Sequence, residues 1–133
     1  MSYSVKYLDH FSHPRGIGEV EPPDAEARVK HEGGGCFDDV RLTLRLADGV
    51  IKEARFRARA CSGTIAACSA LCEMISGLGI EEAARVTAED IANHLEGIPD
   101  AKRHSVELAA KSLIKALEPL PKSLNRNSNP ADQ

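Results

Sequence analysis

Alternating hydrophobic and polar positions predict a β-hairpin in the first half of the chain. Residues 40–46 carry aliphatic side chains at every second position, with charged or polar residues between them. After Ala47-Asp48-Gly49 a second alternating run covers residues 51–60, and it places Ile51 on the same face as Glu53 and three arginines. This pattern is typical of an antiparallel strand pair with one face toward solvent.

From Ser62 the period changes to that of a helix. One stripe of apolar side chains contains Ile65, Cys68, Cys72 and Ile75, and a second contains Leu71, Met74 and Leu78. Two stripes on one helix indicate burial over much of its circumference. Gly77 and Gly79 are expected to end this helix.

Three shorter helices and one further strand complete the predicted fold. A helix over residues 4–11 has Val5, Leu8 and Phe11 on one face, and the His13-Pro14 turn ends it. Thr87 and Asp90 resemble a helix N-cap, which predicts a helix over residues 88–96. Other apolar positions predict a strand over 27–31 and a final helix that starts at His104 and carries Val106, Ala109 or Ala110, Leu113 and Leu117.

Strands followed by helices predict an α+β fold: a small antiparallel sheet of about three strands with helices packed on one face. We assign one domain to residues 1–120. The segment 121–133 has no apolar period and is expected to be a disordered tail.

Composition argues against several classes of function. The chain has 133 residues and a formal charge of −3, without a basic stripe, which argues against nucleic-acid binding. The most apolar stretch, residues 64–80, contains Glu73 and is shorter than the roughly 20 residues of a membrane span. The N-terminus has no apolar signal region, so we expect a cytoplasmic protein whose four cysteines are thiols or metal ligands.

Four potential metal ligands come from three separate segments: Cys36, Asp38, Cys61 and His104. Thiolate, carboxylate and imidazole together suit a soft metal or an iron-sulfur cluster. Cys61 lies where a strand gives way to a helix, and a helix N-terminus lowers the pKa of a thiol.

Each of these residues also has an ordinary structural interpretation. Cys36 is in a glycine-rich loop that can hold an incidental cysteine, and Asp38 can be a turn residue. Cys61 can be a small buried hydrophobe, and His104 a solvated or capping residue.

The remaining cysteines and histidines are expected to be structural or exposed. Cys68 and Cys72 are four residues apart and could hold a metal together, but they share a stripe with Ile65 and Ile75, which favours core packing. No partner at ligand spacing accompanies the other four histidines, which we expect at the surface: His10, His13, His31 and His94.

Four segments resemble, in order, the IscU/NifU-type scaffold for iron-sulfur cluster assembly. They are MSYSVKYLDHFSHPRGIG, GGGCFDDVRLTLRL, ARFRARACSGTIAACSALCEMISG and IPDAKRHSVELAAKSLIKAL, and the resemblance extends over residues 2–118. It implies a SufE/NifU-like scaffold fold and a binding protein rather than an enzyme.

The resemblance further implies that Cys36, Asp38, Cys61 and His104 bind iron or a transient [2Fe-2S] cluster, with Zn2+ as an alternative. The implied partners are a cysteine desulfurase as sulfur donor and apo iron-sulfur proteins as acceptors, in a monomer or weak homodimer.

The chain departs from the family at two places. Ser105 stands where the family has a third cysteine, which is commonly assigned as an acceptor of persulfide sulfur. The stretch Ile98-Pro99-Asp100-Ala101-Lys102 only loosely resembles the Leu-Pro-Pro-Val-Lys stretch that some members offer to a chaperone. Two alternative functions follow: a thiol-based persulfide carrier, or a zinc-binding scaffold with an interaction role.

Overall fold

The computed structural model describes residues 3–33 and 36–120, without the side chain of Cys36. In chain order the elements are α1 Val5–Ser12, β1 Ala25–Gly33, β2 Cys36–Ala47, β3 Val50–Arg59, α2 Ser62–Ile75, α3 Ile80–Ala83, α4 Ala88–His94, the 3₁₀ turn η1 Asp100–Lys102 and α5 Arg103–Leu117. The predicted tail, 121–133, lies outside the described residues. The short helix α3 was not predicted.

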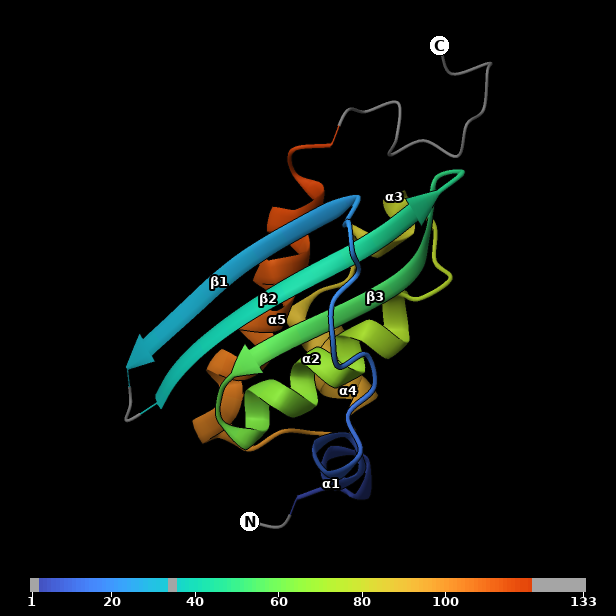
Figure 1. Ribbon diagram of the computed structural model, residues 1–133. Helices are drawn as coiled ribbons and strands as arrows, with labels where there is room; N and C mark the ends of the chain where they lie inside the picture. Colours follow the sequence, from blue (N-terminus) through green and yellow to red (C-terminus); the bar gives the residue numbers. More distant parts are fainter. Residues whose placement is uncertain (1–2, 34–35, 121–133) are drawn as a thin grey trace.

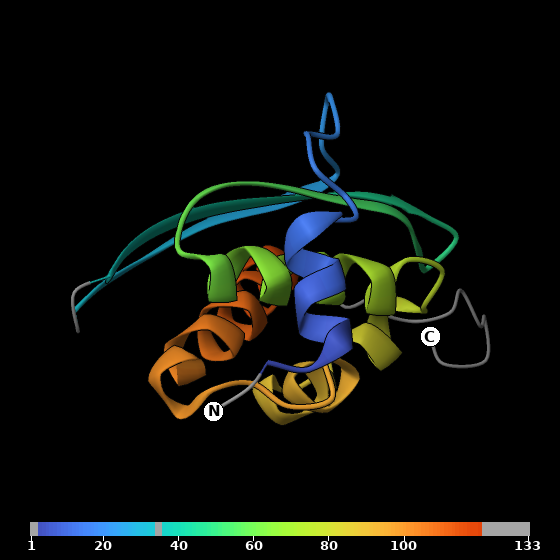
Figure 2. The same cartoon turned by 90° about the horizontal axis from the view of Figure 1, so that it is seen from below.

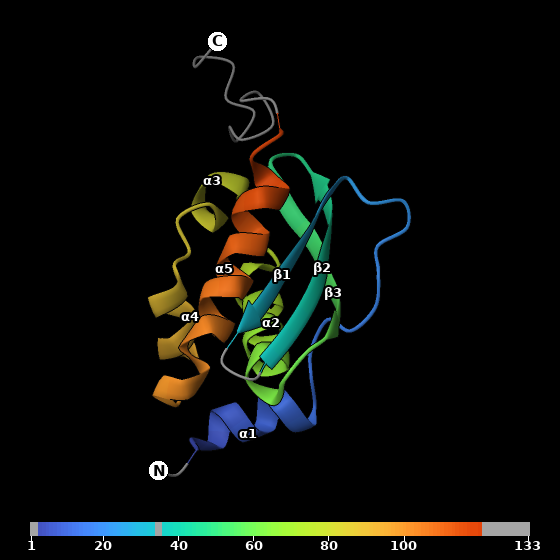
Figure 3. The same cartoon turned by 90° about the vertical axis from the view of Figure 1, so that its left-hand side faces the viewer.

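The three strands form one antiparallel sheet in the order β1-β2-β3. Figures 1 and 3 show this sheet as one layer, with α2 and α5 on one of its faces. Seen from below, the sheet curves over the helices (Figure 2). The predicted α+β fold, with about three strands and helices on one face, is therefore confirmed.

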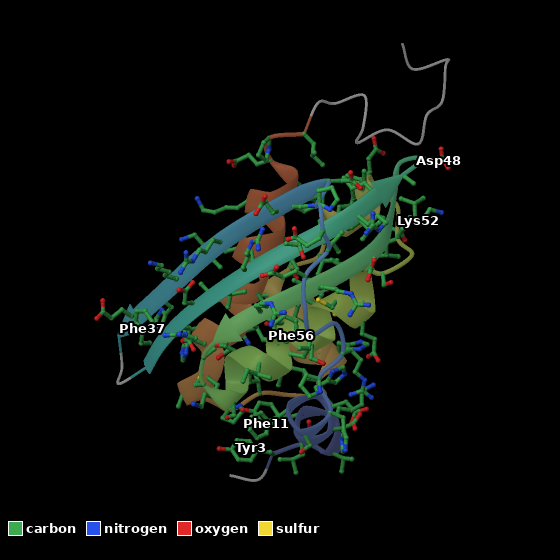
Figure 4. The ribbon with its side chains drawn as sticks, in the orientation of Figure 1. Tyr3, Phe11, Phe37, Asp48, Lys52 and Phe56 are labelled. Carbon is green, nitrogen blue, oxygen red and sulfur yellow. The ribbon has the colours of Figure 1, made fainter. Side chains whose placement is uncertain are left out.

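The core lies between the sheet and the two long helices. α5 packs on β1 and β2, and α2 packs on β3 and on α5. From the sheet, Leu42, Leu44 and Phe56 are almost completely buried, and Leu71 and Leu113 meet them from the helices. Phe56 points from the middle of β3 in Figure 4. The stripes predicted from the period of α2 thus face the core.

One strand face was predicted wrongly. The alternation placed Ile51 with the charged residues, but Ile51 is fully buried. The register of β2 and β3 shifts between Arg45 and Leu46, so that Arg45 pairs with Glu53 while Leu46 pairs with Ile51. The extra residue, Lys52, forms a bulge, which reverses the side-chain alternation at that point.

The apolar face predicted for α1 is also not the buried one. Val5, Leu8 and Phe11 are exposed, whereas Tyr7 and His10 are buried against the rest of the protein. Phe11 of α1 and Tyr3, which precedes this helix, lie at the bottom of Figure 4. A helix this short is held by its few tertiary contacts, and these contacts use a different face from the one that its period suggests.

The segment between α1 and β1 crosses the outer face of the sheet (Figures 1 and 2). Its backbone pairs with Phe56 of β3, through Gly18 N–H donating to Phe56 O and Phe56 N–H donating to Gly16 O. Gly16 has a φ of +80°, and a Cβ there would lie 2.8 Å from Cys72 Cβ. Only glycine fits this close approach.

Within the described residues, no helix combines the length and apolarity that a membrane crossing requires.

Candidate metal centre

Three of the four predicted ligands meet at one end of the molecule. The β1–β2 hairpin end, the junction of β3 with α2 and the first turn of α5 converge there (Figure 1). Asp38 belongs to β2, Cys61 precedes α2, and His104 is in the first turn of α5. Segments that are 23 and 43 residues apart in sequence thus place a carboxylate, a thiol and an imidazole next to one another.

Asp38 is a strand residue rather than a turn residue, and it is fully buried. Its Oδ1 accepts a hydrogen bond of 2.9 Å from the backbone N–H of Cys61. Its Oδ2 lies 3.2 Å from Nε2 of His104 but accepts no hydrogen bond, and among the described side chains it is the one buried polar atom without a partner. An unpaired buried carboxylate oxygen is costly unless a cation satisfies it, so this atom fits a metal ligand.

Cys61 is the N-cap residue of α2 and is half-buried. Its Sγ lies 3.6 Å from Thr64 Oγ1, 3.7 Å from His104 Nε2 and 3.7 Å from Ser105 Oγ. Burial raises the pKa of this thiol, but hydrogen bonds from Thr64, Ser105 and His104 outweigh burial and lower the pKa from 9.0 to about 7. A thiol with this pKa is about half ionised at pH 7, and metals bind the thiolate form.

His31 completes the cluster, although it was predicted to lie on the surface. Its ring stacks on that of His104, with centroids 4.3 Å apart, and single ligand atoms of His31, Asp38 and His104 all lie within 4.8 Å of one another. The hairpin register pairs His31 with Asp38 across the strands. The Gly33-Gly34-Gly35 run in the sequence is a hairpin signal from which this pairing could have been predicted.

Cys36 is the first residue of β2 and pairs with Gly33. It was predicted in a loop, but its backbone is in the strand, two residues before Asp38 and at a position on the same strand face. The side chain of Cys36 lies outside the described part of the structure, so its role as a ligand stays a prediction.

Ser105 is fully buried beside Cys61, and its Oγ accepts a 3.0 Å hydrogen bond from Thr64. A Cβ on Gly63 would lie 2.7 Å from this oxygen, so the glycine allows α2 and α5 to approach closely here. Ser105 therefore stands within reach of the thiol, where it supplies a hydrogen bond but no soft ligand.

Cys68 and Cys72 are buried in the core, as predicted. Burial raises the pKa of Cys68 well above its usual value and that of Cys72 to about 12. Buried thiols of this kind are poor nucleophiles and poor metal ligands. Both cysteines are therefore packing residues.

Of the three remaining histidines, one is exposed and two face the protein interior. His13 is exposed, as predicted, whereas His10 is fully buried and His94 is partly buried beside it. The prediction of surface positions was therefore wrong for His10, because α1 turns its other face toward the protein.

Comparison with known proteins identifies the family. Residues 2–126 match the family described as "NifU-like N terminal domain". The chain is 35% identical over 115 residues to the "Iron-sulfur cluster assembly scaffold protein IscU 1" of Archaeoglobus fulgidus, covering 86% of this chain and 74% of that protein. It is 34% identical over 118 residues to the Escherichia coli protein named "Iron-sulfur cluster assembly scaffold protein IscU", covering 87% and 91%.

Solved structures show the same fold. A Brucella abortus structure described as a NifU-like protein (N-terminal) aligns with a TM-score of 0.67 at 19% identity, covering 86% of this chain and 90% of that one. The α+β sheet with its helical layer is thus the fold of NifU-type proteins. The chain belongs to the NifU-like N-terminal domain family, which includes the IscU-type scaffolds.

Proposed function

We propose that this protein is an iron-sulfur cluster assembly scaffold that holds iron or a transient [2Fe-2S] cluster with Cys36, Asp38, Cys61 and His104. The observation that carries the proposal is the buried Asp38 oxygen without a partner, 3.2 Å from Nε2 of His104. Membership of the family whose relatives are named scaffolds supports the same function.

The proposed ligands suit a cluster that must later be transferred to another protein. Cysteine thiolates bind cluster iron firmly, whereas a carboxylate is a harder and weaker ligand for it. Asp38 also accepts the N–H of Cys61, so the strand and the start of α2 are fixed to each other at the site. This protein would thus bind and pass on a cluster rather than catalyse a separate reaction.

The missing third thiol changes how sulfur arrives. Because Ser105 cannot carry a persulfide, sulfur from a cysteine desulfurase would be received by Cys36 or by Cys61, whose pKa of about 7 makes it the better nucleophile of the described thiols. Apo iron-sulfur proteins would then take the assembled cluster. Docking of a chaperone at residues 98–102, a cytoplasmic location and a monomeric or weakly dimeric state remain predictions.

Anaerobic reconstitution with ferrous iron and sulfide tests the proposal. The wild-type protein should develop visible absorption with bound iron and sulfide, and Cys61→Ala should abolish it. Cys68→Ala is the matched control, since it removes a buried core thiol outside the site. A colourless wild-type protein, or Cys61→Ala with full absorption, would contradict the proposal.

A zinc-binding scaffold with an interaction role is the second candidate, and one observation favours it. With Ser105 in place of a third cysteine, the predicted donors are two thiolates, one carboxylate and one imidazole, which is a complete four-coordinate Zn2+ set. Metal analysis of protein purified without oxygen distinguishes the two: zinc without iron or sulfide, lost in Cys61→Ala, selects this candidate.

The persulfide carrier has weaker structural support. It needs Cys68 or Cys36 to resolve the persulfide of Cys61, and of these two thiols Cys68 is fully buried with a raised pKa. Mass spectrometry after incubation with a desulfurase and cysteine tests it, and absence of added sulfur on Cys36 and Cys61 would exclude sulfur transfer through this protein.

A further inference from the structure

A second group of metal-ligating side chains lies away from the candidate metal centre. His10 of α1, Glu73 of α2 and His94 at the end of α4 bring their side chains together from three helices. Nε2 of His10 lies 3.2 Å from Glu73 Oε1, and Nε2 of His94 lies 2.7 Å from the same oxygen. The ligand atoms of all three residues lie within 4.8 Å of one another.

We propose that His10, Glu73 and His94 form a second metal site, which binds a divalent transition-metal ion of the Zn2+ class. Two imidazoles and one carboxylate are a donor set that Zn2+ accepts, with a water molecule as the fourth ligand. Glu73 and His94 are both partly exposed, so the ion and its water can enter from solvent, while buried His10 closes the inner side.

The distances are close to those that the ion needs. With bonds of about 2.0–2.1 Å, tetrahedral geometry separates two ligand atoms by about 3.3 Å. The pair of His10 and Glu73, at 3.2 Å, already has this separation. His94 must move outward from Glu73 by roughly 0.6 Å, which exchanges a hydrogen bond for a metal bond, and its partly exposed side chain at the end of a short helix can make this adjustment.

Ser69 orients His10, the buried ligand of the proposed site. Its Oγ lies 2.7 Å from Nδ1 of His10 and accepts a 2.8 Å hydrogen bond from the backbone N–H of Arg15. A hydroxyl oxygen has two lone pairs, so it can accept from both donors. With its proton on Nδ1, His10 presents an unprotonated Nε2 toward Glu73, and outer hydrogen bonds of this kind are usual around metal-bound histidines.

The neighbouring charged side chains leave the carboxylate of Glu73 available to bind the ion. Arg15 approaches Glu73 with its Nε 3.7 Å from Oε2, but its NH2 group binds Asp9 at 2.7 Å. The charge of Arg15 is thus shared with Asp9, and Oε1 of Glu73 faces only the two imidazoles. A hydrogen bond from His94 lowers the pKa of Glu73, and burial lowers the pKa of His10.

The second site is separate from the first. Glu73 follows Cys61 by twelve residues along α2, which corresponds to about 18 Å at 1.5 Å per residue. One ion cannot contact both groups. Because its ligands come from three helices, an ion here would hold α1 against α2 and α4, and would stabilise the folded state by mass action.

Equilibrium dialysis with Zn2+ tests the proposal in the full-length Cys36→Ala/Cys61→Ala/His104→Ala protein, which lacks the predicted thiolates and the His104 imidazole of the first centre. This protein should retain one bound Zn2+, and the Co2+-loaded form should show no thiolate charge-transfer band. Adding His94→Ala or Glu73→Gln should weaken that binding by at least about tenfold. Adding His13→Ala should leave it unchanged, since this exposed histidine contacts Asp9 outside the cluster.

Two results would overturn the proposal. One is the absence of Zn2+ binding by the folded Cys36→Ala/Cys61→Ala/His104→Ala protein, which would leave the cluster as a hydrogen-bonded tie between helices. The other is binding that neither His94→Ala nor Glu73→Gln weakens, which would assign the ion elsewhere. Glu73→Gln keeps the size of the side chain, so it provides an answer even if His94→Ala perturbs α4. Neither result depends on whether the first centre holds a cluster.

Discussion

Replacing Ser105 by cysteine should give the candidate centre the third thiol that the family resemblance expects. Ser105 Oγ lies 3.7 Å from Sγ of Cys61 and is fully buried, so the new sulfur would lie beside the existing thiol. We predict that Ser105→Cys holds a reconstituted cluster at least about tenfold longer than wild type against a chelator, because soft thiolate replaces a hydroxyl that offers no bond to iron.

The substitution should also cost stability. The Ser105 oxygen accepts a 3.0 Å hydrogen bond from Thr64, and a Cβ on Gly63 would be only 2.7 Å from it, so a larger sulfur is crowded. Overpacking costs about 1–3 kcal/mol and a weakened buried hydrogen bond about 1 kcal/mol, which together suggest about 3 kcal/mol. At roughly 4 °C per kcal/mol for a chain of this size, the melting temperature of the apo protein should fall by about 12 °C.

The assay follows visible absorption after anaerobic reconstitution and addition of a chelator. Ser112→Cys is the matched control, since Ser112 is a fully buried serine on the same helix, two turns from the site, with its Oγ donating to Ala109 O. It should destabilise the apo protein without prolonging the life of the cluster. If Ser105→Cys folds but loses its cluster as fast as wild type, position 105 does not limit retention and the reasoning is wrong.

Three further predictions test the site and the fold. Alkylation of Cys61 should accelerate as pH rises and level off above about 7, because its lowered pKa makes the thiolate available at lower pH than in an ordinary thiol. Buried Cys68 should stay unreactive in the same mass spectra. A midpoint of the Cys61 alkylation curve near pH 9 would contradict the hydrogen bonds assigned to this thiol. Asp38→Ala should slow transfer of the cluster to an apo acceptor by about tenfold, since the weaker oxygen ligand is lost; unchanged transfer kinetics would remove this role for Asp38. Gly16→Ala should lower the free energy of unfolding by about 3 kcal/mol in urea titrations, because the cost of a positive φ and the cost of a steric clash add up. Gly77→Ala is the control: Gly77 also has a positive φ, but a Cβ there would meet open space, so this variant should cost about 1 kcal/mol. Equal losses for the two glycine variants would show that the close approach at Gly16 does not matter.

Local periodicity was sufficient to predict most elements. The change of period at Ser62 marks the start of α2, and the predicted N-cap of α4 at Thr87 and Asp90 is present, as a capping box. These features depend on side-chain spacing and hydrogen bonds within a few residues, which a single sequence displays directly. For the same reason the burial of Cys68 and Cys72 followed from the stripe that they share.

Long-range packing decided what local patterns could not. The bulge at Lys52 depends on pairing with β2, and it turned Ile51 into the core against the apparent alternation. His10 was predicted at the surface but is buried, because the position of α1 on α2 and α4 selects its inward face. Neither outcome is encoded within the window of residues that a periodicity covers.

The same division applies to the candidate centre. The residue types and the cysteine at the start of α2 could be recognised from sequence, and the resemblance grouped them into one set. Only the tertiary structure placed His31 on His104 and left an oxygen of Asp38 buried without a hydrogen bond. The physical reason is that distance, burial and hydrogen-bond pairing are properties of side chains brought together across the fold, whereas a sequence specifies which groups are available to meet.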